Sequence, residues 1–190
     1  MWQRILIAAA LAGTAGHAAA MDLDLSLSDE TAEIGVVGNP QTGASDRAEA
    51  GAALFFTDDS DFVGSGFWHI TGRLREGFEP LKFGAGVKVY GADLDAADTT
   101  VGALALGGSL RYDIPNLQVP LAATVQGHMA PDITTTGRGD GMTELVGRVE
   151  ARFARTASAY VGYRYLRFDV EHARDARLDT NFHVGLRMQF

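Results

Sequence analysis

The sequence predicts an all-β protein, a transmembrane antiparallel β-barrel of roughly 8–10 strands, on the basis of three observations. Segments in which polar and apolar residues alternate recur along the chain, separated by clusters of Gly, Asp, Asn and Pro. The chain contains 23 glycines, and no amphipathic helical pattern of useful length is found. It also ends on the alternating segment HVGLRMQF, as expected if the last residues complete a strand.

The N-terminal segment, residues 1–20, is predicted to be a secretory signal peptide. Arg4 gives a positive start, small and apolar residues run from Ile5 to Gly16, and Ala18–Ala20 forms an A-x-A cleavage pattern. The apolar run is too short to span a membrane as a helix. Cleavage after this pattern leaves residues 21–190, which we predict to form a single outer-membrane β-barrel domain.

The amino-acid composition argues against several classes of function and structure. The net charge is −8, and no basic patch supports nucleic-acid binding. The chain has no cysteine, so an exported domain of this size needs stability from another source, such as an extensive hydrogen-bonded sheet. After the predicted signal peptide no long apolar run occurs, which argues against a transmembrane helix.

Eight strong segments and two weaker ones are predicted to be strands. Each strong segment is close to the length of about 9–11 residues that a tilted strand needs to cross a bilayer. The strong segments are 47–57, 61–73, 81–92, 100–113, 117–129, 142–154, 158–170 and 180–190, and the weaker ones are 23–28 and 32–37.

The connections predict an orientation. Tight turns are expected near 115–118 and 155–157, and longer polar loops at 93–99, 131–141 and 171–179. In an outer-membrane barrel with an even number of strands, both termini and the short turns lie in the periplasm, and the long loops face outward.

Alternate positions define the two faces of each strand. In the last strand Phe182, Val184, Leu186, Met188 and Phe190 share one face, and His183, Gly185, Arg187 and Gln189 share the other. A soluble exported barrel or sandwich would place the apolar face inside, whereas a membrane barrel inverts this arrangement. Glycines on the polar faces favour the membrane barrel, as do the aromatic residues near strand ends, namely Trp68, Tyr90, Tyr112, Phe153 and Phe168.

The polar faces carry charges that a membrane barrel would direct into its lumen. One interpretation is a pore lining that selects solutes by charge. The other is a packed polar core, because a barrel of about eight strands is only wide enough for its own side chains. The predicted lumen-facing charges are Lys82, Lys88, Glu144, Arg148, Glu150, Arg152, Arg164 and Arg187.

The last strand resembles the C-terminal targeting signal of bacterial outer-membrane proteins, which reads polar-x-Gly-x-x-hydrophobic-x-aromatic. The matching residues are His183, Gly185, Met188 and Phe190. The resemblance implies recognition by the barrel-assembly machinery and a location in the outer membrane of a Gram-negative bacterium. Lipid, including lipopolysaccharide, is then an expected partner.

Several stretches in order resemble the YfaZ family of outer-membrane proteins. They are LDLSLSDETAEIGV, GAGVKVYGADLD, ALALGGSLRYDIP, ASAYVGYRYLRFDVE and LDTNFHVGLRMQF, which together cover most of the chain from Leu23 to Phe190. The resemblance implies an outer-membrane β-barrel that is sometimes described as porin-like. It supplies no catalytic residues.

Other motifs favour structural interpretations. The glycines of GAGVKVYG lie inside a strand pattern, so a dinucleotide site is not expected. Asp93, Asp95 and Asp98 offer too few oxygen ligands for a calcium loop, and GRGDG is typical of a glycine turn. The four histidines after the signal peptide, at 69, 128, 172 and 183, show no metal-ligand spacing.

These observations predict a structural or porin-like outer-membrane barrel, with a narrow channel for small solutes as one form of it. No enzyme activity, catalytic residue, cofactor, metal site or nucleic-acid partner is predicted. A lipid-modifying outer-membrane enzyme and a soluble exported barrel are the alternatives.

Overall fold

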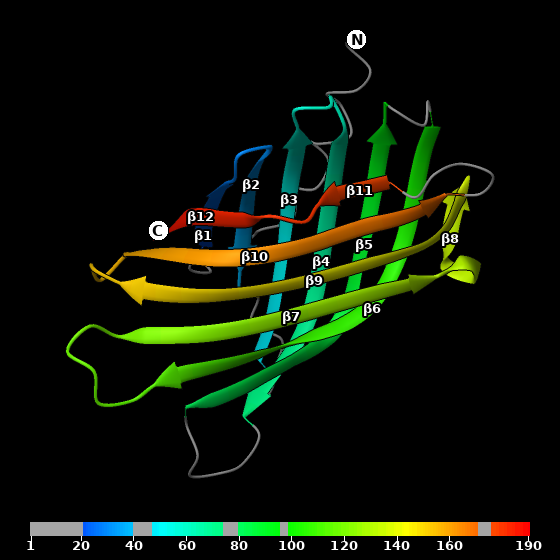
Figure 1. Ribbon diagram of the computed structural model, residues 1–190. Coiled ribbons are helices and arrows are strands. Elements are labelled where there is room, and N and C mark those ends of the chain that lie inside the picture. The colour runs from blue at the N-terminus through cyan, green and yellow to red at the C-terminus, as the bar shows by residue number, and fades with distance from the viewer. Residues whose placement is uncertain (1–20, 40–46, 74–79, 96–98, 171–175) are drawn as a thin grey trace.

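The computed structural model describes residues 21–39, 47–73, 80–95, 99–170 and 176–190. They form an antiparallel β-barrel (Figure 1) in which the last strand of the chain pairs with the first. The ring contains ten strands, which are β1 Met21–Leu27, β2 Thr31–Gly38, β3 Arg47–Thr57, β4 Phe62–Arg73, β5 Leu81–Leu94, β6 Thr99–Ile114, β7 Leu121–Pro131, β9 Gly139–Arg152, β10 Ala157–Val170 and β12 Phe182–Gln189.

Two short strands extend the sheet outside the ring. β8 (Thr135–Gly137) pairs with β6, and β11 (Ala176–Asp179) pairs with β10. Both occur where the sequence predicts only loops, at 131–141 and 171–179, so that prediction is wrong for these residues. A short 3-10 turn, η3 (Asp132–Thr134), precedes β8.

The predicted barrel is confirmed, and its strands lie close to the predicted segments. The weaker segments at 23–28 and 32–37 form β1 and β2, which decides between eight strands and ten. The largest shift is in β7, which begins at Leu121 and not at 117. Asn116 adopts a left-handed turn (φ 61°) and Pro120 has no N–H to donate, so pairing starts only after them.

The barrel has two ends, named here by the connections they carry. The terminal end holds Met21 and Phe190 together with the connections 115–120 and 153–156, and the loop end holds the opposite ends of all ten strands. The predicted separation of tight turns from long loops is only partly correct. The connection between β1 and β2 is a tight turn at the loop end, where the Ser28 hydroxyl accepts the N–H of Thr31 at 2.9 Å.

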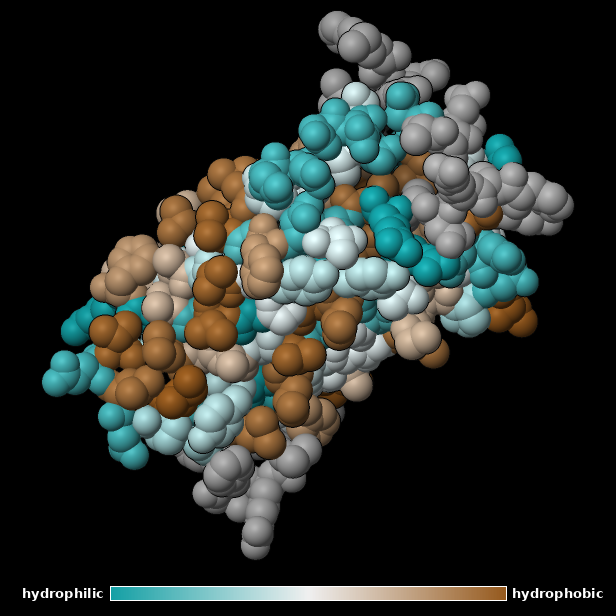
Figure 2. All heavy atoms as spheres, viewed as in Figure 1, coloured by the Kyte–Doolittle hydropathy of each residue, from teal (hydrophilic) through white to brown (hydrophobic). Residues whose placement is uncertain are grey.

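The outer wall of the barrel is apolar and its interior is polar over much of its length. Large side chains such as Leu106 and Phe182 are exposed on the wall, whereas Glu144 and His183 are buried inside. This is the inverted arrangement of a membrane barrel. Figure 2 shows apolar side chains gathered over the terminal part of the visible wall and hydrophilic ones toward the loop end. Among the described residues no helix is long and apolar enough to cross a membrane.

The apolar belt stops short of the loop end on the longer strands. On β10 the outward residues change from Val161 and Tyr163 to Arg167 and Asp169. The strands therefore continue past the belt, and their inner faces there enclose a separate apolar cluster.

Two of the aromatic residues predicted to lie in the interfacial girdles do not lie there. Tyr90 and Phe168 are buried inside the barrel, where their rings meet edge to face at 6.2 Å. Tyr90 shares its face with Lys88 two positions earlier, so the alternation of the strand directs it inward. Trp68, Tyr112 and Phe153 are exposed on the outside, as predicted.

The belt gives a first testable expectation. Leu106 lies near the middle of β6 on the outer wall, and its side chain is 64% exposed. The substitution Leu106→Arg therefore introduces a charge on the outer surface of the apolar belt. We expect it to destabilise the membrane-inserted barrel by about 2–4 kcal/mol, since a charge there faces lipid. Reversible urea unfolding in lipid vesicles measures this cost, with Thr100→Arg, beyond the belt on the same strand, as the matched control. Equal stability of the two variants would contradict the assigned belt.

Candidate functional site: the lumen

Four groups of polar side chains line the lumen, each joining strands that are distant in sequence. Nearest the terminal end, Lys82 on β5 lies 2.7 Å from Asp113 on β6. Arg111 contacts Asp113 at 2.9 Å and reaches Glu150 on β9 at 3.0 Å. Lys82 and Asp113 are 44% and 38% exposed, so this end of the lumen is open to solvent.

The second group closes the ring between its last and first strands. Asp24 on β1 accepts the Nε–H of Arg187 on β12 at 3.0 Å, and Arg148 on β9 lies 3.4 Å from the same carboxylate. The hydroxyl of Tyr160 on β10 donates to the other oxygen of Asp24. Arg148 also lies over the Tyr160 ring, 5.2 Å from its centre. Two guanidinium groups and a phenol thus share one carboxylate.

Glu144 on β9 is the centre of the third group. Both of its oxygens accept from the Lys88 ammonium at 2.9 Å, and one accepts from the Tyr90 hydroxyl at 2.8 Å. The Nδ1 of His128 lies 3.3 Å from the carboxylate, and its Nε2 lies 2.9 Å from the Nε2 of His69. Glu144 is only 4% exposed, so these partners replace the water it has lost.

The fourth group lies on the β2 and β10 side of the barrel. Arg164 donates to Glu33 at 2.8 Å and lies 3.9 Å from Asp179 on β11. Its guanidinium also stacks over the Phe55 ring at 5.1 Å. The Thr31 hydroxyl donates to Asp179 at 3.3 Å.

Apolar side chains fill the lumen at the loop end. We call them the apolar cluster. They come from eight strands and are nearly or fully inaccessible to solvent. The members are Phe55, Val63, Tyr90, Ala92, Leu94, Val101, Ala103, Ala105, Ala130, Met142, Leu166, Phe168, Val170 and Leu178. The lumen therefore passes from a solvent-exposed charged end, through buried ion pairs, to a buried apolar region.

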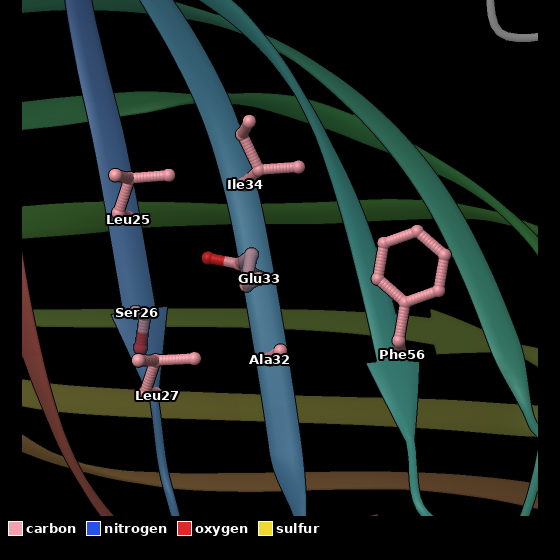
Figure 3. Close-up of a pocket in the computed structure, with 7 residues that line it drawn as sticks. All are labelled: Leu25, Ser26, Leu27, Ala32, Glu33, Ile34 and Phe56. Carbon is pink, nitrogen blue, oxygen red and sulfur yellow. The ribbon is translucent and has the colours of Figure 1, made fainter.

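A depression on the outside of the barrel offers no alternative solute site. It is lined by Leu25, Ser26 and Leu27 on β1, Ala32, Glu33 and Ile34 on β2, and Phe56 on β3 (Figure 3). All of these except Ser26 and Glu33 belong to the apolar wall, so lipid would cover the depression. The small side chain of Ala32 between larger neighbours leaves the hollow.

A family model described as YfaZ precursor matches residues 3–190. The chain belongs to the YfaZ family. The resemblance carried by its sequence motifs is thereby confirmed.

Solved structures add only distant similarities for this YfaZ family protein. A KdgM porin in complex with disordered oligogalacturonate has 8% identity and a TM-score of 0.47, covering 90% of this chain and 99% of that one. Outer-membrane expressed OmpT of Vibrio cholerae has 16% identity and a TM-score of 0.40, covering 84% of this chain and 56% of that one. No curated protein matches the chain.

The structure places most of the predicted lumen-facing charges of this YfaZ family member in the polar groups described above. Arg152 differs, since it lies exposed at the terminal end of β9. The sequence does not identify the ion-pair partners of these lumen-facing charges. Alternation places the partner residues on the inner faces of their strands, but it does not show which opposite charge each of them contacts. The partners are Asp24, Glu33, Arg111, Asp113 and Asp179.

The four residues of the predicted assembly signal lie on the closing strand or directly after it. His183 is buried and Phe190 is exposed at the terminal end, where its N–H donates to the Met21 carbonyl at 2.9 Å. Met188 faces outward opposite Leu23. Gly185 lies directly beneath the ring of Tyr160. A Cβ at this position would come within 2.2 Å of that ring, so only glycine fits here.

Asp93 and Asp95 of the acidic motif lie at the loop end. Asp61, between β3 and β4, accepts the backbone N–H of Asp95 at 2.8 Å. Burial raises the pKa of the Asp61 carboxyl, the Asp95 N–H opposes this, and the charges of Asp59 and Asp95 add to it. Asp98 of the acidic loop is outside the described residues, as are His172 and the predicted signal peptide. Within the described ranges, no group of three or more His, Cys, Asp or Glu residues could hold a metal ion.

Proposed function

We propose that this protein is an outer-membrane β-barrel of a Gram-negative bacterium whose lumen is closed in the conformation described, and that its primary role is structural. The observation that carries the proposal is the apolar cluster at the loop end, backed by the buried ion pairs around Glu144 and Arg164. A solute would have to displace both to pass. The outer-membrane assignment is supported by the apolar wall and by membership of the YfaZ family.

The orientation follows from the barrel rule for termini. Because the strand number is even and the chain ends meet at one end, we place the terminal end in the periplasm and the loop end outside. Lipid, including lipopolysaccharide, would surround the wall, and the barrel-assembly machinery would recognise the closing strand during insertion.

A narrow porin-like channel is the second candidate. It is favoured by the solvated terminal end, where Lys82, Asp113 and Arg111 provide charges of both signs. Such a channel would need a rearrangement of the apolar cluster to conduct.

The lipid-modifying enzyme is the less favoured alternative. Such an enzyme needs a base and a nucleophile that its substrate can reach. His69, His128 and His183 are all buried in the lumen. Unchanged lipid A mass spectra on overexpression would be consistent with the structural role.

Planar-bilayer recording tests the closed lumen. We expect the refolded protein to give no steady conductance, because the loop end is filled. Phe168→Ala combined with Met142→Ala removes two of the largest buried side chains of the apolar cluster, and we expect this variant to conduct in discrete steps. Phe153→Ala, which truncates an exposed aromatic in the connection after β9, is the matched control and should remain silent. Regular steps from the unmodified protein would favour the channel.

A further inference from the structure

Two histidines lie in one row of the lumen wall. The register pairs His69 on β4 with Gly86 on β5, Gly86 with Gly107 on β6, and Gly107 with His128 on β7. Since neither glycine has a side chain, both rings extend over the bare backbone and meet. Their Nε2 atoms are 2.9 Å apart and their planes differ by 17°. A Cβ on Gly107 would come within 2.5 Å of the His128 ring, so this contact depends on the glycine.

The contact between the two rings limits how many protons they can hold. A hydrogen bond between two ring nitrogens needs a proton on one and a lone pair on the other. Nδ1 of His128 lies 3.3 Å from the Glu144 carboxylate, so a proton on this nitrogen would point at a carboxylate oxygen. A second added proton turns both Nε2 atoms into donors and sets two positive charges against each other. The doubly charged pair cannot keep this geometry.

Among the residues that the structure describes, Glu49 is the free-standing candidate to receive a charged His69. Glu144 already accepts from Lys88 and Tyr90. Glu49 on β3 is the register partner of His69 on the side away from Gly86, and opposed residues share a face of the sheet. Other described groups around the pair are the Phe67 ring, Gln126 beside His128, and Arg164, whose charge acts on Glu144.

We propose that His69 is a proton-operated switch in the lumen. In the neutral or singly protonated pair it lies over Gly86 and Gly107 against His128. The second proton releases it toward Glu49 and exposes the wall beside the Lys88–Glu144 ion pair, next to the apolar cluster. The switch itself needs only the barrel geometry, but its effect on the closed lumen rests on the proposed function.

Histidine NMR of the full mature chain in detergent micelles tests the switch. With isotope-labelled histidine, ring signals are followed from about pH 8 to about pH 3, which spans the ordinary titration range of the side chain and extends below it. We expect the His69–His128 pair to take up its two protons in steps at least about one pH unit apart. In His128→Gln, His69 should titrate in a single step. His183, buried elsewhere in the lumen, is the internal reference and should not change between variants.

Two further variants complete the test. Glu49→Gln should move the second step to lower pH while leaving the first in place, because it removes the negative charge that stabilises the charged ring. His69→Gln, observed from His128, repeats the coupling test if His128→Gln does not fold. Identical His69 titration in the presence and absence of His128 would overturn the switch, and an unchanged second step in Glu49→Gln would overturn its destination. Neither result depends on conductance, so the proposed closed barrel is judged separately.

Discussion

Replacing Glu144 with leucine is expected to destabilise the folded barrel by about 3–5 kcal/mol, because it removes one partner of a buried ion pair. The Lys88 side chain would remain buried without its carboxylate, and Tyr90 and His128 would lose their shared acceptor. Urea unfolding in lipid vesicles, followed by the fluorescence of Trp68, measures the change.

A double variant separates a lost ion pair from a disturbed shape. Lys88→Leu combined with Glu144→Leu removes both charges, and we expect it to recover most of the stability lost in the single variant. Asp29→Leu, on an exposed turn carboxylate, should change stability by less than about 0.5 kcal/mol. A Glu144→Leu effect as small as that of Asp29→Leu would contradict the assignment of Glu144 as the centre of the lumen network.

Replacing Gly185 with valine is expected to impair barrel closure severely. A Cβ at this position would overlap the Tyr160 ring and lie 2.5 Å from the Leu25 carbonyl. Tyr160 crosses Gly185 to reach Asp24, so a side chain there displaces the contact that links β10 to β1 across β12. Overpacking of this kind costs about 1–3 kcal/mol, and each 1.4 kcal/mol lowers the equilibrium constant for folding about tenfold. The folded fraction in isolated outer membranes, read from heat-dependent gel mobility, should therefore fall.

Gly185 has two proposed roles, as part of the C-terminal assembly signal and as the position over which the Tyr160 ring packs, and experiments can separate them. If packing of Tyr160 is what matters, Tyr160→Ala in the Gly185→Val background should restore part of the folded fraction. If the assembly signal matters, the double variant should fold as poorly as Gly185→Val, and deleting Phe190 should reproduce the defect. Spontaneous refolding into vesicles without the assembly machinery should show the effect of packing alone. Normal membrane levels of both Gly185→Val and the Phe190 deletion would contradict both roles.

The strands and their two faces were predictable because both depend on local alternation. The residues from Phe182 to Phe190 show it most simply, since polar and apolar positions alternate along the whole of β12. The same rule places Tyr90 on the inner face together with Lys88. The prediction that Tyr90 belongs to the interfacial girdle relied on its position near a strand end, and it is wrong.

The cross-strand partners could not be predicted, since they depend on register. His69 and His128 are separated by two intervening strands, and their contact needs Gly86 and Gly107 at one level. A shift of one residue between any two of these strands would abolish it. The short strands β8 and β11 were missed for a related reason, because they are held by pairing with β6 and β10 and show little alternation of their own.

The closed lumen is the central claim, and cysteine accessibility tests it most directly. The chain contains no cysteine, so single replacements need no prior changes. In protein inserted into vesicles, Lys82→Cys should react with a small charged thiol reagent, since this position is at the solvated terminal end. Ala103→Cys, within the apolar cluster, should stay unreactive when the reagent is present on both sides of the membrane. Rapid labelling of Ala103→Cys in the folded barrel would show an open lumen and contradict the account.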